Sequence, residues 1–197
     1  MDMFSKKVAS LTFLLTSSFI PAWCASDSTW YPNAATPYPG TSFHCTVTPL
    51  PKGLPGIPST DTLFIDHCFA VVLKCAQEKE LMMKAIGDNK AFSGNDRFRA
   101  KVQSELTRLQ GLSIPTGLEN FESDIEQALN LQITFFDKAS KQSASGASLD
   151  QVLTIPEGKE ASQKLFAAWD ELQKRYTSWN PATKDSIYHH FQALDLY

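Results

Sequence analysis

From residue 59 onward, apolar residues recur every three or four positions along most of the chain, which is the spacing of one helical face. Four stripes of this kind occupy residues 98–109, 121–136, 161–179 and 187–194. Asn180 and Pro181 precede the last stripe, and these residues suit the N-cap and the first turn of a helix. The pattern therefore predicts four amphipathic helices.

The segment 63–76 is different, because it is apolar on nearly every side. Only Asp66, His67 and Lys74 interrupt it. A helix that is apolar all round belongs in the middle of a fold. We expect a central buried helix that is capped by one of Ser59, Thr60 and Asp61 and ends at Gly87.

The connections between these stripes carry helix-start signals and loop residues. Residues 140–148 read as a Ser/Ala/Gly linker, and residues 149–155 as a short apolar strap. Three pairs resemble capping boxes, in which a Ser or Thr precedes an acidic residue by three positions: Ser93 with Asp96, Thr116 with Glu119, and Thr154 with Glu157. No segment reads as a convincing strand, so we expect an all-α fold, an antiparallel four- to five-helix bundle over 59–197.

The N-terminal part is organised differently. Residues 1–24 resemble a secretory signal peptide, with Lys6 and Lys7 before a moderately apolar stretch that is too short to span a membrane. The position of signal cleavage stays open. Residues 25–58 contain seven of the eleven prolines and four large aromatic residues, which predicts an extended, Pro-rich arm.

Composition narrows the class of protein. The 197 residues include 18 Lys and Arg against 21 Asp and Glu, and 43% are apolar. This balance is typical of one globular domain and excludes a disordered chain or a polycationic nucleic-acid binder. We also expect no transmembrane segment, because no stretch reaches the ~18 apolar residues that a span needs.

The four cysteines suggest a covalent link between arm and bundle. Cys68 and Cys75 are separated by about 10.5 Å along a helix, whereas a disulfide needs Cα atoms roughly 4.4–6.8 Å apart. We therefore expect Cys45 to pair with Cys68 or Cys75, with Cys24 a possible partner for the other if it survives cleavage. Buried free thiols are the alternative.

Known catalytic motifs are missing from the sequence. It contains no Gly-rich nucleotide loop, nucleophile elbow, metalloprotease H-E-x-x-H or C-x-x-C motif. His44 and His67 each precede a cysteine and are weak candidates for a metal, but we expect no metal site and no cofactor. The sequence thus favours a non-enzymatic protein, although an enzyme whose site assembles from distant residues stays open.

A basic stripe is the best candidate for binding. Arg97, Lys101 and Arg108 fall on one face of the predicted helix, where basic residues outnumber acidic ones in an otherwise acidic chain. Such a stripe can hold anionic lipid or polysaccharide headgroups. The alternative is that it is a solvated or internally paired face, with Arg108 close to Glu119 or Glu122.

The sequence is most typical of a secreted or periplasmic interaction protein that contacts a protein, a lipid surface or a glycan, and not a nucleic acid. A periplasmic chaperone, adaptor or inhibitor is the alternative, and an enzyme is the third. The sequence does not determine the oligomeric state.

Overall fold

The computed structural model describes residues 56–88 and 95–196. Within these residues the chain forms helices joined by short connections and contains no strand, which confirms the all-α prediction. The six helices are α1 (Ser59–Gly87), α2 (Asn95–Gln110), α3 (Glu119–Ala144), α4 (Leu149–Leu153), α5 (Pro156–Arg175) and α6 (Pro181–Leu194).

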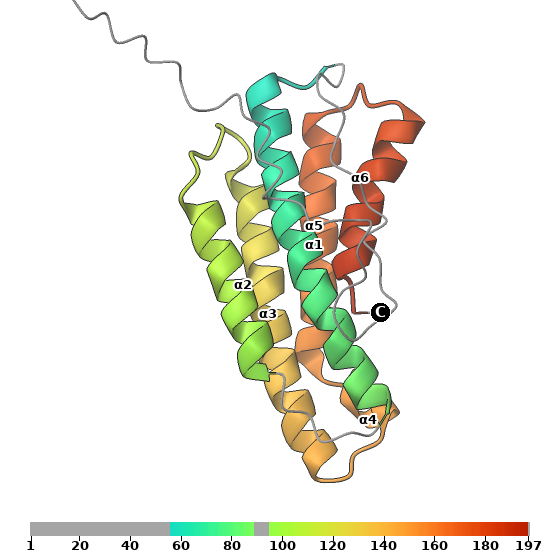
Figure 1. Cartoon of the computed structure of the whole chain (residues 1–197). Coiled ribbons are helices and arrows are strands. Elements are labelled where there is room, and N and C mark those ends of the chain that lie inside the picture. Colours follow the sequence, from blue (N-terminus) through green and yellow to red (C-terminus); the bar gives the residue numbers. More distant parts are fainter. Residues whose placement is uncertain (1–55, 89–94, 197) are drawn as a thin grey trace, which may run out of the picture.

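The long helices run up and down in an antiparallel bundle (Figure 1). α2 and α3 lie beside α1 on one side, α6 lies on its other side, and α5 packs behind (Figure 1). α3 and α5 form the most extensive helix pair, and α1 packs against α2, α3 and α6. The short connections leave each long helix next to an antiparallel neighbour, as the loop lengths predict.

α1 is the central helix, as its all-round apolar sequence predicts. Every residue in 68–79 is buried, including the charged residues Lys74, Glu78 and Lys79. Buried charges are costly unless they are paired, and each of these three has a partner on another helix or on the segment after α6. The helix therefore carries a few obligatory polar contacts within an apolar core.

The aromatic core joins α1, α3 and α6. The ring of Phe69 stacks on His190 with centroids 4.3 Å apart, and it meets Phe121 and Phe191 edge-on at 6.2 and 5.3 Å. Edge-on and offset stacked rings are the favoured arrangements of aromatic pairs. These contacts fix the position of α6 against the middle of the bundle.

The end of α6 is held by polar contacts with two other helices. Lys79 Nζ donates to the carbonyl oxygens of Ala193 and Asp195 at 3.1 and 2.6 Å. Gln132 Nε2 donates to the carbonyl oxygen of Leu194 at 2.7 Å. The last carbonyls of a helix have no partner within it, so these contacts satisfy groups that burial would otherwise leave costly.

The region between α3 and α5 differs from the prediction. α3 continues to Ala144 through most of the expected linker, and the expected apolar strap is a five-residue helix, α4. Ser148 begins α4 with a capping box to Gln151, in which each side chain accepts a hydrogen bond from the other residue's backbone N–H. The bundle thus has one more helix within the described residues than the five that we predicted.

Most of the predicted helix caps are wrong where the structure describes them. α1 starts at Ser59 after Pro58 without a side-chain cap. The candidate Asp61 instead accepts hydrogen bonds from Tyr176 and Arg175. A tertiary partner has therefore replaced the local one.

The two capping boxes predicted at Thr116 and Thr154 are also absent. Leu118 and Ile155 are the N-caps of α3 and α5, and neither helix has a side-chain cap. The Thr154 hydroxyl donates backwards to the Gln151 carbonyl at 2.7 Å, because Thr154 ends α4. The cap at Asn180 is confirmed, since its side chain accepts the Thr183 N–H at 2.8 Å.

Several predictions lie outside the described residues. These are the signal peptide 1–24, the arm 25–58 up to residue 55, the candidate cap Ser93, and the residues Cys24, His44 and Cys45. None of the helices within 56–88 and 95–196 combines the length and apolar character needed to cross a membrane.

Candidate functional site

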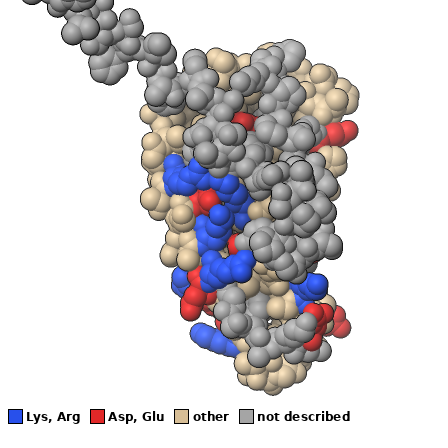
Figure 2. All heavy atoms as spheres, in the orientation of Figure 1, with Lys and Arg blue, Asp and Glu red and all other residues tan. Residues whose placement is uncertain are grey.

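The three predicted basic residues lie on α2, on the side that meets α1. Arg97, Lys101 and Arg108 are joined there by Lys74 from α1, and we call these four residues the α1–α2 basic cluster. In the orientation of Figure 1, Lys and Arg side chains form a band over α1 and α2, with a few carboxylates between them (Figure 2). The stripe is therefore a surface built by two helices and not by α2 alone.

Glu105 is the centre of this cluster. Its side chain is only 5% exposed, and its two carboxylate oxygens receive three cations. Arg108 Nη1 lies 2.7 Å from Oε2, Lys101 Nζ lies 3.1 Å from Oε1, and Lys74 Nζ lies 3.5 Å from Oε2. One negative charge thus stands against three positive charges at close range.

A second carboxylate holds the other end of the cluster. The buried Glu78 of α1 accepts two hydrogen bonds from Arg97, one from Nε at 2.8 Å and one from Nη2 at 3.1 Å. Such bidentate contacts are among the strongest ion pairs that arginine makes. The cluster thus gathers four cations around two buried carboxylates.

The electrostatics of the cluster follow from burial and crowding. Burial alone would raise the pKa of Glu105, but the Lys101 hydrogen bond and the charges of Lys74, Lys101 and Arg108 outweigh it and lower the pKa. The pKa of Lys74 is lowered mainly by burial, with repulsion from Arg108 and Lys101 adding to it against the attraction of Glu105. Glu105 therefore stays ionised, and the cations repel one another around it.

The internal pairing that we considered for Arg108 takes a different form. Arg108 pairs with Glu105, one turn earlier on its own helix, and not with Glu119 or Glu122. The carboxylate of Glu119 accepts the backbone N–H of Gly117 at 2.6 Å. Across the α2–α3 turn, the side-chain contact is instead between Gln110 and Glu126.

Sequence reasoning missed Lys74 and Glu78 as members of this site. They lie four positions apart on α1, Lys74 inside the apolar segment 63–76 and Glu78 just after it, and each contacts a residue of α2. The signal was present, because charged residues in a buried helix require partners. Which partners they find depends on how α2 packs.

The described cysteines do not pair with one another. Cys68 and Cys75 are both free and fully buried on α1. Burial raises the pKa of each thiol well above its usual value, so neither is a reactive thiolate. The structure therefore does not show the predicted link from Cys45 to Cys68 or Cys75; Cys45 and the further candidate Cys24 lie outside the described residues, and the link stays a prediction.

The described residues hold no group of histidine, cysteine and carboxylate side chains that suits a metal ion. His67 is half-buried on α1. His189 and His190 lie on different faces of α6, the first exposed and the second fully buried.

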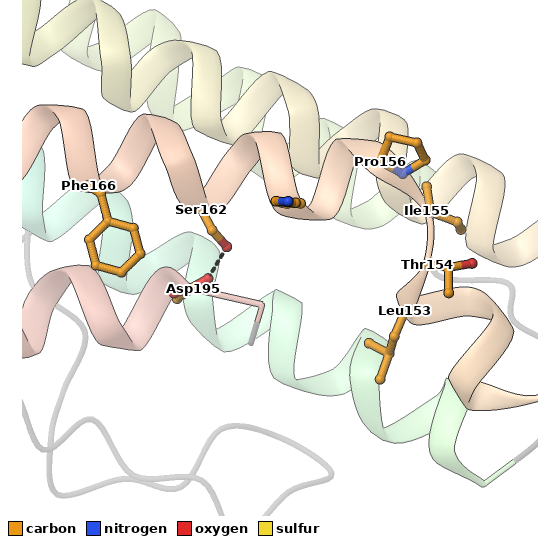
Figure 3. A pocket seen from close by; sticks show the side chains of 8 residues that line it. Leu153, Thr154, Ile155, Pro156, Ser162, Phe166 and Asp195 are labelled. Atoms are coloured by element: carbon orange, nitrogen blue, oxygen red, sulfur yellow. Dashed lines mark hydrogen bonds between the residues drawn. The ribbon is translucent and has the colours of Figure 1, made fainter.

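A groove of about 660 Å³ lies beside α5 and is lined partly by apolar residues (Figure 3). Its walls include Ile155, Pro156 and the exposed Phe166, and Ser162 donates a hydrogen bond to the carboxylate of Asp195 across it (Figure 3). A serine nucleophile needs a base that accepts its proton. None of the described residues that line the groove is a histidine, and the Asp195 carboxylate also accepts the Leu196 N–H at 2.7 Å. The contact therefore anchors the segment after α6 to α5.

A scan of protein-family models, a search of curated proteins and a search of solved structures each return no match to this chain.

Proposed function

We propose that this protein is a secreted, non-catalytic binding protein whose α1–α2 basic cluster holds oxyanions, the phosphate or sulfate groups of an anionic surface. The observation that carries the proposal is the convergence of Lys74, Lys101 and Arg108 on the buried carboxylate of Glu105. An incoming oxyanion would relieve the mutual repulsion of these cations. The charge placement thus favours a ligand of negative charge.

The chemistry of the cluster suits oxyanions in particular. A guanidinium group carries five N–H donors in a planar fork that matches the oxygens of a phosphate or sulfate. Arg97 and Arg108 supply two such groups, and they lie eleven positions apart on α2. That spacing corresponds to about 16 Å along a helix, so the cluster can contact more than one anionic group at once.

The proposed secretion depends on the N-terminal segment 1–24 and its resemblance to a signal peptide. N-terminal sequencing of the protein recovered from the producing cells tests it. We expect a mature chain that starts shortly before or after Cys24. A chain that retains Lys6 and Lys7 would contradict this part of the proposal.

Binding is tested with vesicles of a zwitterionic lipid, vesicles that also contain an anionic phospholipid, and a soluble sulfated polysaccharide. We expect the protein to bind at least one of the two anionic probes at low ionic strength and to be released by salt, which screens surface charges. Binding to the vesicles alone identifies a lipid source, and binding to the polysaccharide identifies a glycan. Absence of binding to both would contradict the proposal.

The double variant Lys101→Gln with Arg108→Gln tests the site itself, because it leaves Lys74 to balance Glu105. Basic residues near an anionic surface contribute about 1 kcal/mol each, so binding should weaken about thirtyfold. The matched control is Lys141→Gln with Lys174→Gln, which removes two exposed cations from other helices. Equal loss in both variants would show that only net charge matters and would contradict the site.

A further inference from the structure

A second cavity, of about 520 Å³, lies at the end of the bundle where α1 begins. It is bounded by the first turns of α1, by the connection between α2 and α3, and by the last residue of α5, Arg175. These three segments meet at the upper end of the bundle in Figure 1. The volume falls within the range of about 300–1,000 Å³ that is typical of small-molecule sites.

The walls of this cavity are mainly apolar. Leu63 and Phe64 come from α1, and Leu112 and Ile114 come from the α2–α3 connection. Ile114 is 39% exposed, which is uncommon for a large apolar residue and places it at the rim. An apolar molecule or alkyl chain would cover this surface and remove it from water.

The charges of the cavity are asymmetric. Asp61 contributes a carboxylate that is 5% exposed and already accepts hydrogen bonds from Thr60 at 3.2 Å, Tyr176 at 2.6 Å and Arg175 at 3.0 Å. The Arg175 side chain is 34% exposed. The negative charge is therefore buried and engaged, whereas the positive charge reaches solvent.

Further hydrogen bonds hold Arg175 in this position. Its Nη2 donates to the Thr116 carbonyl at 2.9 Å, and its Nε donates to the Tyr176 hydroxyl at 2.9 Å. Gly117 has a positive φ of 87° and no side chain, and a Cβ there would lie 2.2 Å from Arg175 Nη1. Only glycine both adopts this backbone easily and leaves room for the guanidinium.

We infer that this cavity binds a small amphiphile, an apolar chain or ring system with an anionic headgroup. The apolar part lies against Leu63, Phe64, Leu112 and Ile114, and the headgroup meets the solvent-facing side of Arg175. An ammonium headgroup does not fit, because the Asp61 carboxylate that would attract it is buried and already bonded. The site is separate from the α1–α2 basic cluster and does not depend on the function proposed for that cluster.

Two probes with the same alkyl chain test this inference by calorimetric titration of the full-length protein below their micellar concentrations. Dodecanoate carries a carboxylate and dodecyltrimethylammonium carries a cation. We expect one dodecanoate per chain, bound about tenfold more tightly than the ammonium probe because charge-assisted hydrogen bonds favour the anion. No binding of dodecanoate, or equal affinity for both probes, would overturn the inference.

A pair of matched variants locates the site. Ile114→Asp places a negative charge at the rim, and we expect it to weaken dodecanoate binding about tenfold by repulsion. Leu149→Asp makes the same change at a residue that is 38% exposed on α4, and it should bind as the wild type does. Both residues are exposed, so both variants should keep the wild-type circular dichroism.

The double variant Lys101→Gln with Arg108→Gln separates the cavity from the basic cluster. It should keep dodecanoate binding, because neither residue lines the cavity. Loss of dodecanoate binding in this variant, or an equal loss in Ile114→Asp and Leu149→Asp, would place the anion elsewhere and overturn the inference.

Discussion

Two buried carboxylates, Glu105 and Asp61, are each 5% exposed, but their surroundings differ in charge. Glu105 faces three cations, two of them from its own helix. Asp61 faces one cation, Arg175, and two hydroxyl donors, from Thr60 and Tyr176. The first site gathers several cations around one carboxylate, whereas the second is a single ion pair supported by hydroxyl donors.

The difference is between a cluster of cations on a helix surface and a single ion pair that joins distant segments. At Asp61 the single ion pair joins α1 to the end of α5, and Arg175 extends the contact to the loop before α3 through the Thr116 carbonyl. Removal of Asp61 or Arg175 leaves the other residue without its partner in this ion pair. At Glu105 three cations from two helices converge on one carboxylate, and it is this arrangement that we propose holds a further anion.

The largest effect is expected when either carboxylate is removed. Glu105→Gln removes the buried carboxylate that Lys74 faces, and Asp61→Asn removes the carboxylate that pairs with Arg175 and accepts a hydrogen bond from Tyr176. Breaking a buried pair in this way costs about 3 kcal/mol, so each variant should lose about that much free energy of unfolding in a urea titration.

The two carboxylate variants should differ in binding, and this difference tests the comparison. Glu105→Gln removes one negative charge from the basic cluster and should strengthen binding to anionic vesicles or to the sulfated polysaccharide. Asp61→Asn should leave that binding unchanged. The comparison fails if both variants, or neither, bind the anionic probe more tightly.

A smaller effect is expected when one cation is removed from each site. Lys101 and Arg175 are matched in exposure, at 33% and 34%. Lys101→Gln should cost less than about 0.5 kcal/mol, because Lys74 and Arg108 still face Glu105. Arg175→Gln should cost about 2 kcal/mol, because Asp61 loses the cation that pairs with it and a hydrogen bond. Equal melting temperatures for the two variants would show that the loss of one cation costs the same at both carboxylates, which would contradict the comparison.

The smallest effect is expected in the pH dependence of stability. The pKa of each carboxyl is lowered in the folded protein, because hydrogen bonds and neighbouring cations outweigh burial. The stabilisation is therefore complete above the ordinary pKa values, 4.5 for Glu105 and 3.8 for Asp61, and is lost as the pH falls below them.

Acid titration followed by circular dichroism measures this loss. Between pH 5 and about 3, the free energy of unfolding should fall more steeply for the wild type than for Glu105→Gln or Asp61→Asn, since each variant lacks one of the titrating groups. Identical slopes in all three proteins would mean that neither carboxyl titrates differently in the folded state.

The positions of the long helices could be predicted from the sequence, because the helical period of apolar residues is a local property. The stripe from Phe121 to Phe136 and the cap at Asn180 are examples, since both depend on residues within a few positions of one another. The five-residue α4 was missed, because a helix that short leaves too few turns for a period to be seen.

The partners of the charged residues could not be predicted in the same way. Asp61 and Thr116 looked like helix caps, but the first pairs with Arg175, 114 positions away, and the carbonyl of the second accepts a bond from the same arginine, 59 positions away. Local capping contributes about 1 kcal/mol, and a buried ion pair that must be satisfied outweighs it.

The sequence by itself determined the all-α class, the antiparallel order of the long helices and the presence of Arg97, Lys101 and Arg108 on one helix. Only the tertiary structure decided that Lys74 and Glu78 of α1 complete that site, and that α1, the α2–α3 connection and Arg175 enclose a cavity. The physical reason is the distance along the chain over which each kind of interaction acts. Apolar periodicity acts over one or two helical turns, whereas a buried charge takes whichever partner the packing of distant helices brings within about 3–4 Å.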